Sequence, residues 1–248
     1  MQPPTDPTAA AEAPAPEPDP PAEVRQRWRL TFRRGAVPAE LVGRAAIEAW
    51  QAALGESGLA LAQLDAAGRP RIAFAAPLPA ASEGEAELAE IFLAERIPAW
   101  RLREAIADRL PAGHELLSAE DVWLGAPALP GRVVAADWRV ELEPAGIDRD
   151  TLEAAAERLL AAASLPRTRS KGGADKLYDL RPLLDDIRVT KAVAGEPVTG
   201  ERVAVGIRTR FRPELGSGRP EEVVAALGES AGTELLITRI VREGLVLA

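Results

Sequence analysis

The pattern that decides the fold first shows at residues 24–34, which read VRQRWRLTFRR. Large apolar side chains alternate here with arginines, the apolar ones being Val24, Trp28, Leu30 and Phe32. Successive side chains of a β-strand point to opposite faces. The alternation therefore predicts a strand with one covered, apolar face and one basic face.

The segments that follow this strand predict the order β-α-β-β-α-β. Proline is favoured in the first turn of a helix, and glycine commonly follows the last turn. Apolar residues recur every three or four positions in the helical segments and every second position in the strands. The predicted elements are a helix from Pro38 to Gly55, strands over 69–76 and 87–95, a helix between Pro98 and Pro111, and a strand over 115–124.

The same order returns in the second half of the chain. Asp150 and Glu153 stand at the spacing of a capping box, which predicts a helix start. A later helix is expected to begin near Pro220 and to end at Gly228. The predicted strands cover 134–142, 178–189, 201–212 and 235–247, with a hairpin through Gly195 and Gly200. Pro182 is expected to interrupt the strand over 178–189 or to make it an edge strand. The sequence thus predicts an α+β protein of tandem ferredoxin-like βαββαβ units, whose antiparallel sheets carry helices on one face.

Composition divides the chain into four parts. Residues 1–23 are rich in proline and alanine, and such a segment buries too little surface to fold, so we expect a disordered tail. Residues 24–125 are predicted to form an N-terminal ferredoxin-like domain, and residues 133–248 a C-terminal one. Between them, residues 126–132 read as a linker because of their two prolines.

Composition also excludes several kinds of chemistry. The chain has no cysteine, so it forms no disulfide, thiolate zinc site or cysteine-ligated iron–sulfur cluster. Its single histidine, His114, follows a glycine and is expected to be an exposed loop residue. We find no catalytic constellation and expect no metal and no cofactor. The absence of a signal peptide and of a long apolar run leads us to expect a cytoplasmic protein without membrane contact.

A basic segment stands out in this acidic chain, whose net charge is −8. Residues 165–220 hold 12 basic and 7 acidic side chains. A flexible loop over 167–173 and a helix start near 216–219 both suit an anion, since free helix N–H groups favour negative charge. The candidate nucleic-acid or anion site comprises Arg167, Arg169, Lys171, Arg181, Arg208, Arg210, Arg212, Ser217 and Arg219.

Structural explanations of these charges stay open beside that hypothesis. The loop could instead be a mobile, solvated hairpin, and the helix start could be an ordinary N-cap with a glycine turn. Arginines of the first strand could pair across the sheet with Glu87 and Glu90, or the two open sheet faces could pack on each other. Asp185 and Asp186 could hold a metal or act as acid and base, but adjacent strand residues point to opposite faces. Tyr178 and Phe92 are the candidate aromatic residues for base stacking.

Several segments resemble one bacterial family. Residues 179–184 (DLRPLL), 216–228 (GSGRPEEVVAALG) and 74–79 (FAAPLP) are similar to stretches of the radical-SAM-linked, or radical-SAM-associated, proteins, a domain of unknown function. The resemblance implies association with a radical SAM enzyme and a tandem fold similar to RNA-binding repeat-associated proteins. The family usually carries a His-Asp pair at its first helix and a Gly-Phe-Asn-Pro segment before its second strand, which residues 42–47 and 64–69 lack.

Together these observations predict an accessory protein. It would bind RNA or present a substrate through an arginine-lined sheet face, with a radical SAM enzyme as its partner. A non-catalytic adaptor that docks an acidic partner is the alternative. A third hypothesis is a hydrolase or transferase with a carboxylate-based site in the groove between the two units.

Overall fold

The computed structural model describes residues 22–38, 41–65, 67–143, 147–171, 174–191 and 203–248. All but the last two residues of the predicted tail lie outside these ranges, as does the predicted hairpin through Gly195 and Gly200. None of the described helices is both long and apolar enough to cross a membrane.

The first unit has the predicted βαββαβ order. Its elements are β1 (Gln26–Arg34), α1 (Arg44–Gly55), β2 (Ile72–Phe74), β3 (Glu83–Leu93), α2 (Ala99–Ile106) and β4 (His114–Val122). The strands lie in the order β4-β1-β3-β2, and each neighbouring pair is antiparallel. This is the ferredoxin-like arrangement, with the first strand at the centre of the sheet.

The second unit repeats this arrangement. Its elements are β5 (Val133–Leu142), α3 (Arg149–Ala161), β8 (Leu184–Lys191), β9 (Val203–Arg212), α4 (Pro220–Ala231) and β11 (Ile237–Leu247), with a short β10 (Gly216–Ser217) after β9. The strand order is β8-β9-β5-β11, again antiparallel throughout. The prediction of tandem ferredoxin-like units is confirmed.

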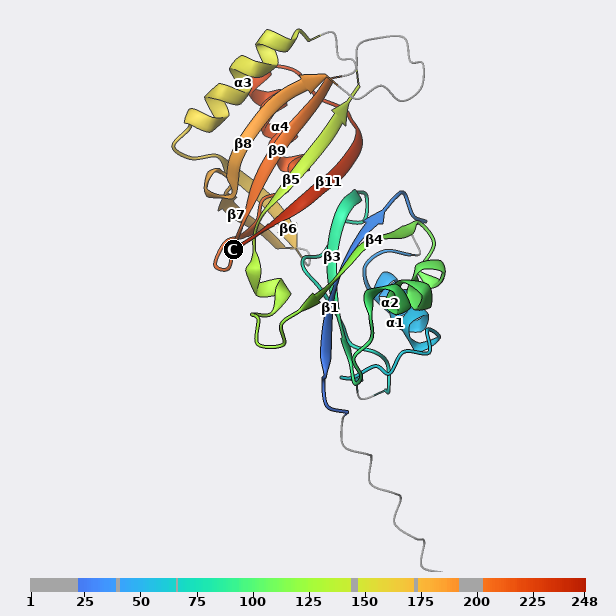
Figure 1. Ribbon diagram of the computed structural model, residues 1–248. Coiled ribbons are helices and arrows are strands. Elements are labelled where there is room, and N and C mark those ends of the chain that lie inside the picture. The colour runs from blue at the N-terminus through green and yellow to red at the C-terminus, as the bar shows by residue number, and fades with distance from the viewer. Residues whose placement is uncertain (1–21, 39–40, 66, 144–146, 172–173, 192–202) are drawn as a thin grey trace, which may run out of the picture.

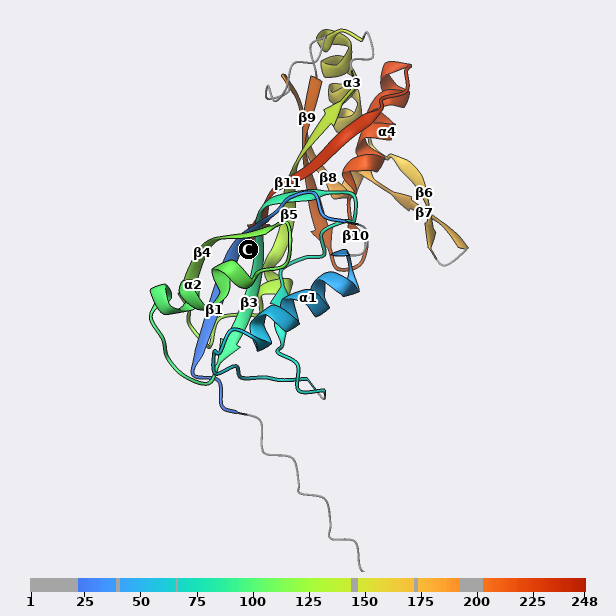
Figure 2. The same cartoon turned by 90° about the vertical axis from the view of Figure 1, so that its right-hand side faces the viewer.

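The segment predicted as a flexible loop or a solvated hairpin over 167–173 belongs to a β-hairpin. Strands β6 (Pro166–Lys171) and β7 (Ala174–Asp179) pair antiparallel from Pro166 opposite Asp179 to Lys171 opposite Ala174. The strand predicted over 178–189 is interrupted at Pro182, one of the two outcomes expected there, because this proline lies in a 3₁₀ turn that separates β7 from β8. The hairpin projects from the side of the sheet that carries α3 and α4 (Figure 2).

The two sheets join into one. Val241 and Arg242 of β11 pair in parallel with Glu83 and Gly84 of β3, which makes a continuous nine-stranded sheet. In Figure 1 the second unit presents its open face to the viewer, and its helices lie behind. One sheet thus spans both units, so strand pairing marks no boundary between them. The division into two domains joined by a linker at 126–132 stays a prediction.

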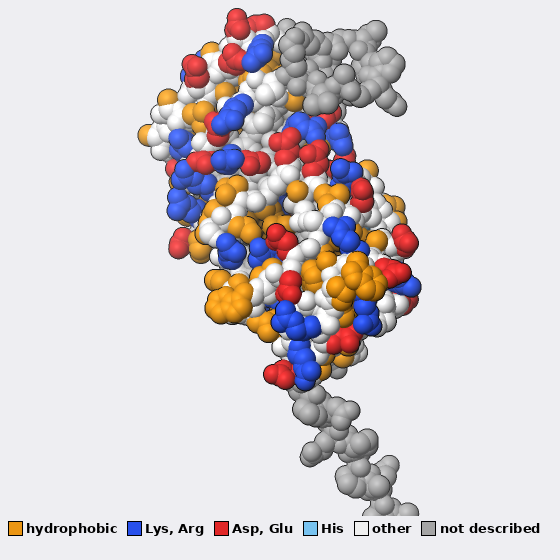
Figure 3. Space-filling model, viewed as in Figure 1, with side chains coloured by type: hydrophobic (Ala, Val, Ile, Leu, Met, Phe, Trp, Pro, Cys, Tyr) orange, Lys and Arg blue, Asp and Glu red, His pale blue; other side chains and the backbone are white. Residues whose placement is uncertain are grey.

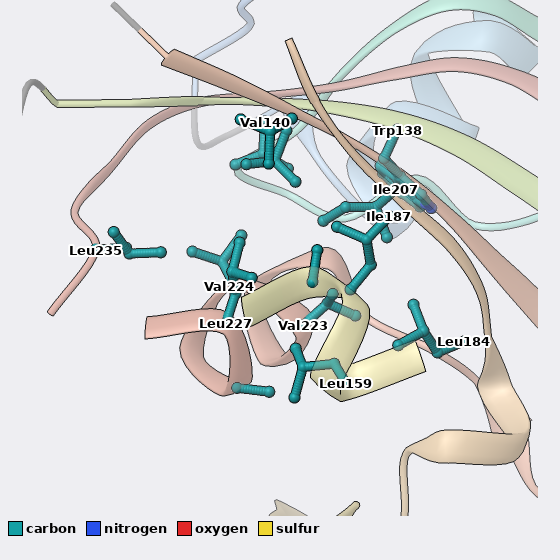
Figure 4. Close-up of a cluster of buried hydrophobic side chains, with 14 of the residues drawn as sticks. Trp138, Val140, Leu159, Leu184, Ile187, Ile207, Val223, Val224, Leu227 and Leu235 are labelled. Carbon is teal, nitrogen blue, oxygen red and sulfur yellow. The ribbon is translucent and has the colours of Figure 1, made fainter. Parts of the chain in front are cut away.

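Each unit has its own core beneath its helices. In the second unit, Leu159 of α3 and Val223 and Leu227 of α4 pack on Val140 and Ile207 of the sheet (Figure 4). Trp138 also lies in this core, and its Nε1 donates to Thr209 Oγ1 at 3.0 Å. In the first unit, Trp50 of α1 and Leu102 of α2 cover the apolar face of β1 and β3 predicted from the alternation.

The opposite face of the first sheet is not the open arginine surface that the sequence suggests. Arg27 and Arg29 both bind Glu90, whose side chain is 1% exposed. Arg27 also donates to the carbonyl oxygens of Ala126 and Pro127, so the connection covers this face. Pairing across the sheet, one of the alternatives above, therefore accounts for these arginines, although the partner is Glu90 alone. Glu87, the other predicted partner, binds Arg242 instead.

Three helix ends differ from the prediction. Helix α1 begins at Arg44, after the N-cap Gly43, and not at Pro38. The N-cap of α3 is Asp148, not Asp150, and its carboxylate accepts the Thr151 N–H at 2.8 Å. Helix α4 continues past Gly228 and ends at Gly232, which has the left-handed φ of 76°. Gly228 serves close packing instead, since a Cβ there would lie 2.6 Å from the Thr233 carbonyl oxygen.

Candidate functional site

The predicted site residues fall on two sides of the second sheet. Arg208, Arg210 and Arg212 alternate along β9 with Ile207 and Thr209, which are buried in the core. The three arginines therefore project from the open face, away from the helices. Arg167 and Arg169 lie in β6 on the helix side, where both pair with α4. The structure does not bring the nine residues into one site.

The open-face group gathers where β8 and β9 meet the 3₁₀ turn. Arg181, Arg210 and Arg212 line a hollow of about 390 Å³ together with Asp185. Arg208, Arg210 and Arg212 line an adjoining hollow of about 300 Å³. We call Arg181, Arg208, Arg210 and Arg212 the arginine edge.

Carboxylates neutralise part of the arginine edge. Arg208 forms two hydrogen bonds to Asp137, its cross-strand neighbour on β5, at 2.6 and 2.9 Å. This contact raises the pKa of Arg208. Arg210 binds Asp185, and Arg212 is exposed and has no ion-pair partner among the described residues. Arg181 donates to two backbone carbonyl oxygens, those of Leu160 and Leu184.

A β-bulge changes the expected placement of the aspartate pair. The register of β8 shifts between Leu184 and Asp186, so two adjacent carboxylates lie near the arginines of β9. Asp186 binds Arg188 at 2.6 Å. With six arginines (139, 181, 188, 208, 210, 212) and four carboxylates (Asp137, Asp185, Asp186, Glu243), the lining of the hollows on this surface has a net charge of +2. Figure 3 shows blue and red side chains interspersed over this face.

The helix-side group is a closed ionic cluster. Arg169 binds Glu222 of α4 at 2.8 Å, and its guanidinium lies 4.6 Å from the centre of the Tyr178 ring. The Tyr178 hydroxyl donates to Glu222, and burial together with this carboxylate raises the pKa of Tyr178 to about 12. Arg167 binds Glu229 at 2.9 Å.

The remaining predicted residues lie at the start of α4 and in the hairpin. Arg219 is the N-cap of α4 and makes no side-chain capping bond, and the Ser217 carbonyl accepts from Arg169. Two glutamates in the first turn, Glu221 and Glu222, already complement the positive end of the helix dipole. The side chain of Lys171 lies outside the described residues.

Sequence reasoning did not predict the carboxylates that form ion pairs with the arginines of the candidate site. Asp137 could have been found, because the alternation of β5 puts it on the polar face, but its partner depends on the register with β9. Glu222 and Glu229 lie on a helix that the sequence does not place beside the hairpin. Tyr178 is half-buried in the ionic cluster, and the guanidinium groups of Arg27 and Arg71 lie 6.0 Å from the ring centre of Phe92.

Carboxylates at the junction of the two units are also paired. Glu83, Glu85 and Glu87 bind Arg239, Arg139 and Arg242, in that order. Among the described residues, no group of three or more histidine, aspartate or glutamate side chains could hold a metal ion. The carboxylate-based hydrolase or transferase hypothesis gains no support from this arrangement.

His114 differs from its prediction as an exposed loop residue. It is the first residue of β4 and lies half-buried, with its ring 5.7 Å from Phe32 and 5.6 Å from Trp50 between centres. Burial lowers the pKa of His114.

The fold defines this chain as an α+β protein built from paired ferredoxin-like units. A family model described as "Uncharacterized protein conserved in bacteria (DUF2344)" matches residues 67–213, and the chain belongs to that family. The matched range extends from the first unit through β9 of the second. No curated protein sequence matches the chain.

One solved structure shares the fold at low sequence identity, and two others align with lower scores. A chain in "Crystal Structure of a Cbf5-Nop10-Gar1 Complex" aligns with a TM-score of 0.50 and 8% identity, covering 88% of this chain and 48% of that chain. A chain in the archaeal box H/ACA sRNP Nop10-Cbf5 complex gives 0.45 and 8%, with the same coverage. An unknown protein from Galdieria sulphuraria gives 0.25 and 15%, covering 90% and 98%. The present chain thus spans about half the length of the first two.

Proposed function

We propose that this protein binds RNA through the arginine edge. The observation that carries the proposal is the excess of guanidinium groups on an exposed sheet face, in a chain that is acidic overall. Arg208 and Arg210 have side chains that are 45% and 43% exposed, and exposed ion pairs are weak. Phosphate groups can therefore replace Asp137 and Asp185 as partners, and guanidinium binds phosphate through two parallel hydrogen bonds.

The proposed contacts are to the phosphate backbone. Open four-stranded sheets of other proteins bind RNA by stacking bases on aromatic side chains. Strand β9 presents arginines at the corresponding outward positions instead. Backbone contacts do not read sequence directly, and their strength falls as salt rises. We therefore expect binding with little sequence preference.

A salt titration tests this proposal. Fluorescence anisotropy of a labelled single-stranded RNA would be measured for the full chain between about 50 and 200 mM salt. The variant R208A/R210A/R212A should weaken binding and reduce the slope of log affinity against log salt by up to about 2, since each lost phosphate contact contributes about 0.7. Absence of binding at low salt overturns the proposal.

A matched variant controls for the change in net charge. R33A/R44A/R149A also removes three arginines, each from an exposed ion pair with a glutamate. This control should keep the affinity and the salt slope of the unchanged protein. An equal loss in both variants would show that only the overall charge matters and would also overturn the proposal.

An acidic partner is the competing occupant of the arginine edge. The aspartates that already bind Arg208 and Arg210 show that carboxylates fit these positions. A poly-glutamate peptide added to the same titration distinguishes the two. If the peptide binds and RNA does not, the protein is an adaptor and not an RNA-binding protein.

We also propose that a radical SAM enzyme is the partner of this protein in the cytoplasm. The family resemblance suggests the partnership, and the lack of cysteine supports a division of labour in which the partner holds the iron–sulfur cluster. Co-expression with such an enzyme, followed by size-exclusion chromatography under anaerobic conditions, should give one species that carries the cluster absorbance. Separate elution of the two proteins at micromolar concentration contradicts the proposal.

A further inference from the structure

The connection between the two units presents apolar side chains to solvent. It runs from the end of β4 to the start of β5 and includes a 3₁₀ turn over Leu129–Arg132. Trp123 and Leu124 are 78% and 46% exposed. Figure 3 shows hydrophobic and basic side chains together over this part of the molecule. Single exposed apolar side chains are common on proteins, so the surroundings of Trp123 decide what its exposure means.

Trp123 is held in place although it is exposed. Its ring packs against Gly125, where a Cβ would lie 2.5 Å from the ring. The Ala126 N–H donates to the Trp123 carbonyl oxygen at 3.0 Å, which closes a turn. Arg27, which is buried, donates to the carbonyl oxygens of Ala126 and Pro127. The turn is therefore anchored to the sheet, and a ring that is ordered before binding loses less entropy when a ligand binds.

Guanidinium groups lie at both ends of the connection. Arg96 has a side chain that is 72% exposed and binds Asp121, two residues before Trp123, at 3.3 Å. Asp121 also accepts from Gln26 at 2.8 Å, so it keeps a partner if Arg96 binds another anion. At the other end, Val134 of β5 lines the same hollow as three residues of the arginine edge. Along the chain, the exposed ring thus lies between two places where guanidinium can bind phosphate.

We propose that a base of the RNA bound by the arginine edge stacks on the Trp123 ring. This inference rests on the proposed function, and it adds that the RNA is single-stranded where it crosses the connection. The bases of a duplex are stacked on one another, whereas an unpaired base can stack on an aromatic side chain. Every base has a π face, so one stacking contact is compatible with the weak sequence preference expected above. A partner protein that buries Trp123 is the competing explanation, and it predicts an RNA affinity that does not depend on Trp123.

Matched substitutions test the stacking contact. Trp123→Ala removes the ring and should weaken binding of a labelled oligoadenylate to the full chain by about 5- to 150-fold, which corresponds to the loss of one stacked base. Stacking releases no counterions, so the slope of log affinity against log salt should stay that of the unchanged protein. Trp123→Phe keeps a ring and should retain most of the affinity. Trp100→Ala removes another exposed tryptophan, which lies on α2 and is 64% exposed, and should leave the affinity unchanged.

Inorganic polyphosphate distinguishes the stacking contact from RNA binding itself. It carries negative charges without bases, so it should bind equally well to the unchanged protein and to Trp123→Ala. RNA affinity that Trp123→Ala does not weaken overturns the stacking contact and leaves the arginine edge as the RNA site. Absence of RNA binding at low salt overturns both proposals. An equal loss of affinity for RNA and polyphosphate in Trp123→Ala, or an equal loss for RNA in Trp100→Ala, also overturns the stacking contact.

Tryptophan fluorescence tests where the base lies. The other three tryptophans of the chain, Trp28, Trp50 and Trp138, are buried. In Trp100→Phe, Trp123 is therefore the single exposed indole, and oligoadenylate should quench its emission because the base stacks directly on the ring. Trp123→Phe should lose this quenching while it still binds RNA. Quenching that persists in Trp123→Phe, or RNA binding by Trp100→Phe without quenching, overturns the contact.

Discussion

Removing the charge of Glu87 should destabilise the whole protein. Glu87 lies on β3 of the first unit and binds Arg242 on β11 of the second, 155 residues away. The two side chains are 4% and 1% exposed. Arg242 also donates to the carbonyl oxygens of Ala76 and Pro77 and lies 5.4 Å from the Trp138 ring centre.

The expected loss in the free energy of unfolding follows from the charged group that stays buried after the substitution. Glu87→Gln keeps the size of the side chain but leaves the buried guanidinium group of Arg242 without its carboxylate partner. Removing one partner of a buried ion pair typically costs about 3–5 kcal/mol. Urea unfolding followed by tryptophan fluorescence gives the free energy of unfolding of both proteins.

An exposed pair is the control for this measurement. Arg33 and Glu115 bind at 2.9 Å with side chains that are 53% and 61% exposed, so Glu115→Gln should change the free energy of unfolding by less than about 0.5 kcal/mol. A loss below about 1 kcal/mol for Glu87→Gln would refute the reasoning. It would mean that water reaches Arg242 or that the guanidinium finds another partner.

Two further predictions concern the second unit. Tyr178 is the single tyrosine of the chain, so an ultraviolet titration should show one phenol with a pKa of about 12, lowered toward the ordinary value in Glu222→Gln. The folded state holds this phenol proton more tightly than the unfolded state, so the free energy of unfolding should fall as pH rises from about 10 to 12. An ordinary pKa for the Tyr178 phenol would contradict the Tyr178–Glu222 contact. Gly218→Ala should cost about 1–3 kcal/mol in urea unfolding, since a Cβ there would lie 2.8 Å from the Leu183 carbonyl oxygen. Gly206→Ala, whose Cβ would lie 3.7 Å from the Arg188 carbonyl oxygen, should cost little, and equal losses would contradict the packing argument.

The repeated alternation of apolar and polar residues was enough to predict the fold. Strands such as β1 and β5 bury one face only, so their period of two is plain in the sequence. The β6–β7 hairpin was predicted only as an alternative to a flexible loop, because polar side chains dominate both of its strands and hide any alternation. The sequence predicted which positions hold the arginines. It could not predict the carboxylates that neutralise them, because these depend on the register of β5 with β9 and on the position of α4, and no local pattern specifies either.

The exposure of Trp123 could not be predicted for a related reason. Trp123 stands at the end of the strand predicted over 115–124, and nothing in that segment indicates that its ring faces solvent. The exposure depends on the turn that follows β4. That turn is held by hydrogen bonds from Arg27, which lies 99 residues before Ala126 in the sequence, so it is a property of the folded chain.

The two-residue parallel contact between β11 and β3 has a consequence for synthesis on the ribosome. Glu87 emerges 155 residues before Arg242, which at about 5–20 residues per second leaves roughly 8–30 s in which the first unit lacks its last neighbour. During that interval the start of β3 is an unpaired strand edge, and exposed strand edges promote aggregation by pairing with strands of other chains. Glu83, Glu85 and Glu87 place three negative charges along that edge. Charged side chains on a strand edge disfavour pairing with another chain, so the carboxylates that later bind arginines of the second unit should also oppose association of the incomplete chain with its copies.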